Sequence, residues 1–207
     1  MSFYPELDGL SMQELVQYFT GAPLDGPEYT AAYYEEVAAQ ISQHKHDGIP
    51  WLFSALHNRS LDTDHVRAIL LALAQSSIED GARIVLQDAL LAALDDPRPL
   101  VVAEAIDGLW RQDMKVARDR ILSLENDPSP SVRASVLRFL SHVYPGAARR
   151  ALRRGLLDAS PLVRETAIDE LDWLGDLKAM GSIAPLLQDV DPAVREAAAT
   201  AVANVAV

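Results

Sequence analysis

The chain has 207 residues, no cysteine, 49% apolar residues and a formal net charge of −12 at pH 7. The lack of cysteine excludes disulfides, thiolate metal sites and a cysteine nucleophile, and no apolar run approaches the length of a membrane span. The opening residues MSFYPELDGL also lack the basic region and apolar block of a secretory leader. We therefore expect a cytoplasmic protein.

Residues 1–47 predict an atypical helical cap. Ser11 and Glu14 have the spacing of a capping box that opens a short helix. A turn-rich loop follows, and then a longer helix from about Glu28 to Gln43. Its aromatic cluster consists of Tyr29, Tyr33 and Tyr34. Terminal units of repeat arrays are usually atypical because they must close the core against water. We interpret this segment as a cap, with a dedicated binding element as the alternative.

Residues 48–85 predict a divergent helix pair, formed by Ile49 to His57 and Asp64 to Ala74. Residues 86–207 then repeat at a constant interval of 31 residues. The interval is marked by Pro99, Pro130, Pro161 and Pro192. An N-cap residue precedes the last three prolines, and proline is favoured at the first helical position. These residues are Ser129, Ser160 and Asp191. We expect a helix to begin at each proline.

Each copy also predicts a helix before its proline. The apolar residues that mark it are Leu90, Ile121, Leu152 and Ile183. Neither helix of a copy can bury its apolar stripe alone, so the copies must stack. The predicted fold is all-α: a right-handed α-solenoid of stacked antiparallel helix pairs with a 31-residue period. The predicted repeats are residues 86–111, 117–144, 148–175 and 177–207.

An aspartate and an arginine six residues apart recur in the last three copies. The pairs are Asp127 with Arg133, Asp158 with Arg164, and Asp189 with Arg195. Stacked copies can align these charges in a ladder of hydrogen-bonded pairs. This ladder would run along the turn edge, the side of the array formed by the turns between the two helices of each copy. With its D-x-x-P-x-V-R core, the chain resembles the HEAT repeats over about residues 86–207. The short period is similar to the HEAT-like repeats of the phycobilisome lyase type. The first copy has Val102 in place of the arginine, so we expect its aspartate–arginine pair, one rung of the ladder, to be missing.

The candidate binding site is the set of second-helix residues that point away from the predicted core. They are Glu104, Asp107, Arg111, Arg138, His142, Asp169, Trp173 and Thr200. Concave faces of repeat arrays bind partners, so we interpret the chain as a non-enzymatic adaptor, chaperone or inhibitor that holds a protein along that face. Trp173 is the sharpest candidate, since exposed tryptophans are frequent hot spots. Packing against the neighbouring repeat is the alternative.

Charge is unevenly distributed along the chain. Residues 111–154 hold 10 basic and 4 acidic side chains, between two acidic ends. Four arginines, named the arginine cluster below, group on one side of a predicted first helix: Arg149, Arg150, Arg153 and Arg154. They predict either a site for an acidic or phosphate-rich partner or a solvated helix face. The carboxylates on both sides argue against nucleic acid as a partner.

No catalytic, metal or cofactor motif is recognised, and we interpret the polar residues near His57 and His65 as a turn. Two alternatives to the adaptor role remain. The resemblance implies a lyase-like subunit that handles a tetrapyrrole, and the acidic charge is typical of a bacterial immunity protein that neutralises a basic toxin. The last segment, AAATAVANVAV, lacks a polar outer face. It predicts either a tolerated shallow surface or packing on another chain, such as a homodimer through this repeat.

Overall fold

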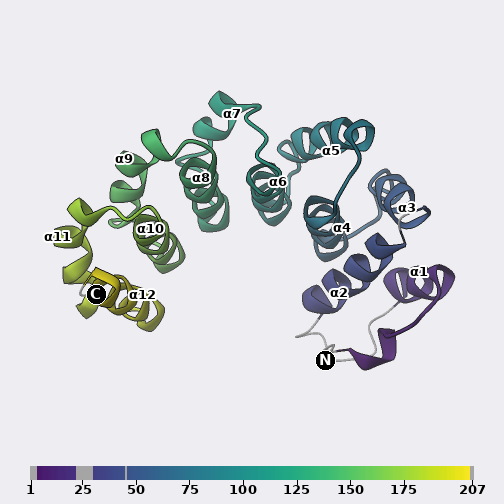
Figure 1. The fold of residues 1–207 in the computed structure, drawn as a ribbon, viewed down its shortest axis with the longest axis horizontal. Helices are drawn as coiled ribbons and strands as arrows, with labels where there is room; N and C mark the ends of the chain where they lie inside the picture. The colour runs from purple at the N-terminus through teal and green to yellow at the C-terminus, as the bar shows by residue number, and fades with distance from the viewer. Residues whose placement is uncertain (1–3, 22–29, 45, 206–207) are drawn as a thin grey trace. The chain divides into compact units, whose positions relative to one another are not determined.

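The computed structural model describes residues 4–21, 30–44 and 46–205. All regular elements in these ranges are helices (Figure 1). The chain divides into two compact units, Met1–Gln112 and Asp113–Val207. Among the described helices none is both long and apolar enough to cross a lipid bilayer.

The first unit contains a 3-10 turn and six α-helices within its described residues. They are η1 (Pro5–Leu7), α1 (Met12–Thr20), α2 (Thr30–Gln43), α3 (Gly48–Ala55), α4 (Thr63–Gln75), α5 (Asp80–Ala93) and α6 (Pro99–Arg111). Helix α4 packs between α2 and α6 in one layer, while α3 and α5 lie in a second layer. Helix α1 packs on α2.

The predicted capping box is present at the start of α1. The Ser11 hydroxyl accepts the Glu14 backbone N–H, and the Glu14 carboxylate accepts the Ser11 backbone N–H at 2.9 Å. Tyr33 and Tyr34 of α2 are buried, whereas Tyr29 lies outside the described residues. The ring of Phe19 packs edge-on against His65 of α4, whose Nε2 lies 2.9 Å from the Phe19 carbonyl oxygen. Residues of α1 and α2 therefore share a core with α4.

The second unit is built from α7 (Arg118–Ser123), α8 (Pro130–Val143), α9 (Pro145–Gly155), α10 (Pro161–Trp173), η3 (Leu177–Ala179), α11 (Met180–Ile183), η4 (Ala184–Gln188) and α12 (Pro192–Val205). Helix α10 packs between α8 and α12 in one layer, and α9 packs against both α8 and α10 from a second layer.

All four repeat prolines are the first residues of helices, as predicted. The capping chemistry differs from the prediction, however, because the Ser129 and Ser160 hydroxyls do not cap their helices. Instead Asp127 and Asp158 accept the backbone N–H of the serine two residues later, each at 2.8 Å. Only Asp191 acts as expected, and accepts the Ala193 N–H at 2.9 Å. The recurring aspartate thus stabilises the turn that introduces each second helix.

The first helices of the repeats are less regular than the second helices. Their marker residues Leu90, Ile121, Leu152 and Ile183 are all fully buried. In the last repeat this helix is divided into η3, α11 and η4. Pro185 lies in the first turn of η4, and proline lacks the N–H that would continue an α-helix.

Candidate protein-binding surfaces

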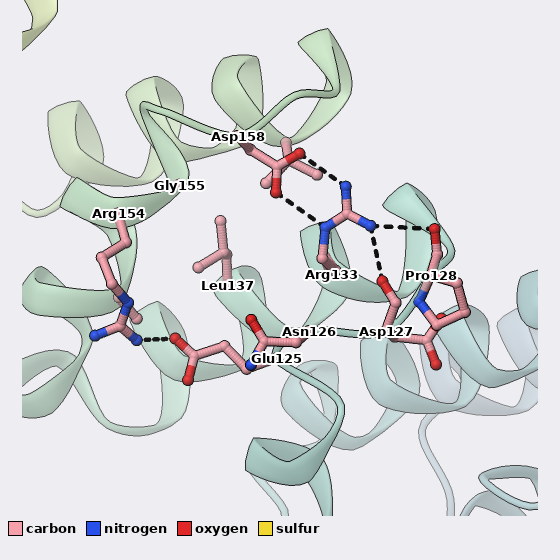
Figure 2. A pocket seen from close by; sticks show the side chains of 11 residues that line it. Glu125, Asn126, Asp127, Pro128, Arg133, Leu137, Arg154, Gly155 and Asp158 are labelled. Carbon is pink, nitrogen blue, oxygen red and sulfur yellow. Dashed lines mark hydrogen bonds and ion pairs between the residues drawn. The ribbon is translucent and has the colours of Figure 1, made fainter.

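An arginine joins consecutive repeats of the second unit (Figure 2). The Arg133 guanidinium donates two hydrogen bonds to the Asp158 carboxylate of the next repeat, at 2.9 Å from Nε and 2.7 Å from Nη2. Its Nη1 donates to the backbone carbonyl oxygens of Asp127 at 2.7 Å and Pro128 at 3.2 Å. One side chain therefore ties the turn of its own repeat to the turn of the following one.

Arg164 repeats this arrangement one copy later. It donates to the Asp189 carboxylate at 2.8 and 2.7 Å and to the backbone carbonyl oxygen of Asp158 at 2.9 Å. Hydrogen bonds from the two arginines hold the pKa of Asp158 and of Asp189 below the usual range. Arg195 donates to the backbone carbonyl of Asp189 at 2.8 Å. Each arginine in the ladder thus bonds the backbone of its own aspartate, and two of them also bond the carboxylate of the next copy.

The first copy has Val102 in place of the arginine, and Arg98 at its cap position bonds differently. Arg98 donates from Nε and Nη2 to Asp96 of its own copy, each at 2.8 Å, and from Nη1 to the Leu61 carbonyl oxygen at 2.9 Å. In the described part of the second unit, no arginine side chain donates to the Asp127 carboxylate, which accepts the Ser129 N–H.

Two of the predicted partner-binding residues, both on α6 of the first unit, are buried. Glu104 and Asp107 on α6 are only 7% and 8% exposed. Glu104 accepts a hydrogen bond from Arg111 at 2.9 Å and lies 3.6 Å from Arg67 of the neighbouring α4. Burial raises the pKa of Glu104. Asp107 accepts the indole N–H of Trp110 at 3.1 Å. The expectation that these two carboxylates face an open surface is therefore wrong, and on one side of Glu104 the neighbouring α4 supplies Arg67.

The predicted residues of the second unit lie on α8, α10 and α12. Trp173, the last residue of α10, is 60% exposed. Its ring packs against His142 of α8 at an angle of 38°, with 4.3 Å between ring centroids, and His142 Nε2 lies 3.3 Å from the Glu170 carboxylate. Trp173 thus contacts the neighbouring repeat and still presents most of its surface to solvent. Asp169 and Thr200 are exposed, and Arg138 is half-buried.

Carboxylates accompany Trp173 on α10. Asp169 precedes it by one helical turn. Although Asp169 is exposed, partial loss of its hydration, together with repulsion from Glu165, Glu170 and Asp172, raises its pKa to about 6. Asp172 accepts a hydrogen bond from Asn204 of α12 at 2.7 Å. This helix end therefore combines an aromatic surface with an excess of negative charge.

The four residues of the arginine cluster differ in the carboxylates that they contact. Arg153 Nη2 donates to Asp176 at 2.6 Å, and Arg149 lies 3.8 Å from the same carboxylate. Arg154 pairs with Glu125, the residue seen beside it in Figure 2. Arg150 is exposed and forms no ion pair in the described part of the chain. With Lys178, the cluster lines a hollow of 930 Å³ that the residue pattern alone does not predict.

Sequence reasoning missed two carboxylates that organise these surfaces. Glu170 is 8% exposed and accepts a hydrogen bond from the buried Ser141 hydroxyl. A signal for it exists, since Glu170 follows the core residue Ala167 by three residues, and residues three apart lie on the same face of a helix. Asp176 is 5% exposed and follows Gly175, whose φ of 58° ends the preceding helix in a left-handed turn. Its role depends on contacts with α9, which local sequence does not reveal.

Comparison with known proteins agrees with this architecture. Residues 87–171 match a family model described as HEAT repeats. No curated protein matches the chain. Its fold is similar to the crystal structure of an engineered protein, with a TM-score of 0.53 and 17% identity over 94% of this chain and 96% of that one. A designed armadillo repeat protein, solved in complex with the peptide (KR)4, has a TM-score of 0.50 and 16% identity over 94% and 99% of the two chains. The chain thus has the fold of a helical repeat protein similar to HEAT and armadillo repeats, and the match to the HEAT repeats extends over residues 87–171.

Proposed function

We propose that the chain is a non-enzymatic protein-binding module that holds its partner on the exposed side of α8, α10 and α12. The observation that carries this proposal is Trp173, which is 60% exposed although His142 supports one side of its ring. A large aromatic side chain that is held in place and left in solvent is a frequent hot spot of protein interfaces.

The carboxylates of α10 indicate the chemistry of the partner. Asp169 and Asp172 lie in the last two turns of the helix, close to Trp173. The pKa of Asp169 is raised to about 6 by partial loss of hydration and by its acidic neighbours, and a lysine or arginine of a partner would relieve this repulsion. The partner segment is therefore basic, with an apolar residue that covers Trp173. The fold comparison supports this choice, since a designed armadillo repeat protein was solved with the basic peptide (KR)4.

A direct test measures the binding of a fluorescent lysine- and arginine-rich peptide that contains one leucine. Trp173→Ala should weaken binding about thirtyfold, as expected of a hot spot. The matched control is Leu162→Ala on the same helix, which removes a side chain that is 40% exposed and should leave binding unchanged. Binding should also be tighter above about pH 7 than below about pH 5, because Asp169 must be ionised. Equal affinity of the two variants would refute the assignment of this surface.

The same variants, immobilised and exposed to a lysate of the source organism, distinguish the finer roles. A protein retained by the intact chain and by Leu162→Ala but lost from Trp173→Ala supports an adaptor or chaperone. Loss of that protein's activity on binding supports an inhibitor, including an immunity protein directed at a toxin. A coloured tetrapyrrole recovered in place of a protein contradicts the proposal and favours the role implied by the lyase-type repeats.

A further inference from the structure

The hollow beside α9 is positively charged in a chain that is acidic as a whole. The arginine cluster and Lys178 line it, and Asp176 is the one carboxylate in its lining. Its volume of 930 Å³ lies within the range of ligand-binding clefts. All of its lining residues belong to the second unit, on elements other than the exposed side of α8, α10 and α12.

The internal contacts orient some of these cations and leave others available. The buried Asp176 forms ion pairs with Arg153 at 2.6 Å and Arg149 at 3.8 Å. Its negative charge is therefore already balanced by these two arginines. Arg150 and Lys178 are exposed and form no ion pair within the described part of the second unit. Arg150 and Lys178 thus remain available to a ligand, next to the two arginines that the buried Asp176 orients. An excess of fixed cations in a concave site attracts anions over distances of about a Debye length.

Apolar side chains at the hollow favour a peptide over a small anion. Leu157 and Leu177 line it and are 87% and 66% exposed. Exposed leucines next to guanidinium groups are complementary to a segment in which acidic and apolar residues alternate. Guanidinium groups also bind carboxylates through two parallel hydrogen bonds. We propose that this hollow is a second binding site, which takes an acidic, leucine-containing peptide segment of a protein partner.

The test uses the full chain and a labelled peptide built from Leu-Glu-Glu triplets, with binding followed by fluorescence anisotropy. The intact protein should bind this peptide at least about tenfold more tightly than the Leu-Gln-Gln counterpart, and the affinity should fall as salt is added. The double variant Arg150→Glu, Lys178→Glu should lose at least about tenfold in affinity. Leu157→Ser should weaken binding of the Leu-Glu-Glu peptide but not of a peptide that contains only glutamate and glycine.

The matched control is Lys115→Glu, Arg118→Glu, which changes the net charge equally at exposed positions that do not line the hollow. It should retain affinity within about twofold, and Trp173→Ala should do the same. Equal losses in the two charge-reversed variants mean that the peptide responds to net charge and overturn the proposal. It is also overturned if the intact protein fails to bind the peptide, or if single-stranded DNA or phosphatidylserine vesicles bind the hollow while the peptide does not. Circular dichroism of each variant excludes loss of fold as the cause.

Discussion

Removing one rung of the arginine ladder should destabilise the second unit measurably. Arg133 makes two hydrogen bonds to the Asp158 carboxylate and two to backbone carbonyl oxygens. Arg133→Ala removes all four and leaves the Asp158 carboxylate, whose side chain is 17% exposed, without its guanidinium partner. The perturbation therefore tests whether the contact between repeats adds stability beyond that of the helices.

The expected cost lies between two limits. An ion pair on an open surface contributes about 0–1 kcal/mol, and breaking a fully buried pair by removing one partner costs about 3–5 kcal/mol. Because both side chains of this pair are 17% exposed, we expect Arg133→Ala to lower the free energy of unfolding by about 2–3 kcal/mol. Urea unfolding at neutral pH, followed by far-UV circular dichroism, measures this difference.

The loss should depend on pH with a defined sign. The hydrogen bonds from Arg133 lower the pKa of Asp158 in the folded protein. A carboxyl group with a lowered folded-state pKa contributes stability above its unfolded pKa of about 3.9, and this contribution is lost as the pH falls through the folded-state value. The stability difference between the intact protein and Arg133→Ala should thus be constant down to about pH 5 and narrow below about pH 4.

Arg195→Ala is the matched control for this rung. Arg195 donates to the backbone carbonyl oxygens of Asp189 and Val190, but within the described residues it has no carboxylate from a following repeat. Its replacement should cost clearly less than that of Arg133, and the cost should change much less between neutral pH and about pH 3, because the charge of Arg195 is only a minor cause of the lowered pKa of Asp189. Equal costs for the two variants, or an Arg133→Ala penalty that is as large at about pH 3 as at neutral pH, would refute the argument that the inter-repeat carboxylate carries the stability.

Two further predictions concern packing and charge. Gly155→Ala should cost about 1–3 kcal/mol in urea unfolding, because its new Cβ would lie 2.8 Å from Leu137 Cδ1 and 2.9 Å from Ala167 Cβ. Gly146→Ala in the same helix meets no atom within 4 Å and should be neutral or stabilise by up to about 1 kcal/mol; a destabilised Gly146→Ala would contradict this reasoning. Asp169→Asn should stabilise the protein at pH 8 by about 1 kcal/mol, because solvent screens part of the repulsion at this exposed carboxylate. Near pH 3 the substitution should not change the stability. Because the pKa of Asp169 is raised to about 6 in the folded protein, the free energy of unfolding should fall as the pH rises from about 4 to 6. If Asp169→Asn shows the same fall as the intact protein, Asp169 is not its cause.

The features that depend on local residue order could be predicted from the sequence. The repeat prolines begin helices, and Ser11 with Glu14 forms the predicted capping box. Contacts between repeats could be predicted only in part. The arginines were recognised, but their carboxylate partners belong to the next copy, 25 residues further along for Arg133 with Asp158.

Exposure of the second-helix residues was the least predictable property. Helical periodicity separates the two faces of one helix, but it does not show how closely the next second helix approaches. Helix α4 lies beside α6, and Arg67 of α4 pairs with Glu104, which is consequently buried. Trp173 stands at the last residue of α10, where the neighbouring helix supplies His142 for one side of the ring and leaves the remainder open. The side of the helix alone therefore does not decide which predicted residues are accessible.

One aspartate per repeat performs several structural tasks at the turn edge. Asp158 accepts the Ser160 N–H with its carboxylate, binds Arg133 with the same group, and accepts Arg164 with its backbone carbonyl oxygen. The turn edge is therefore constrained by hydrogen bonds within and between repeats, and these bonds involve neither Trp173 nor Arg150. Because the turn-edge hydrogen bonds do not include Trp173 or Arg150, substitutions of these two residues should leave the bonds that Asp158 makes with Arg133 and Arg164 in place.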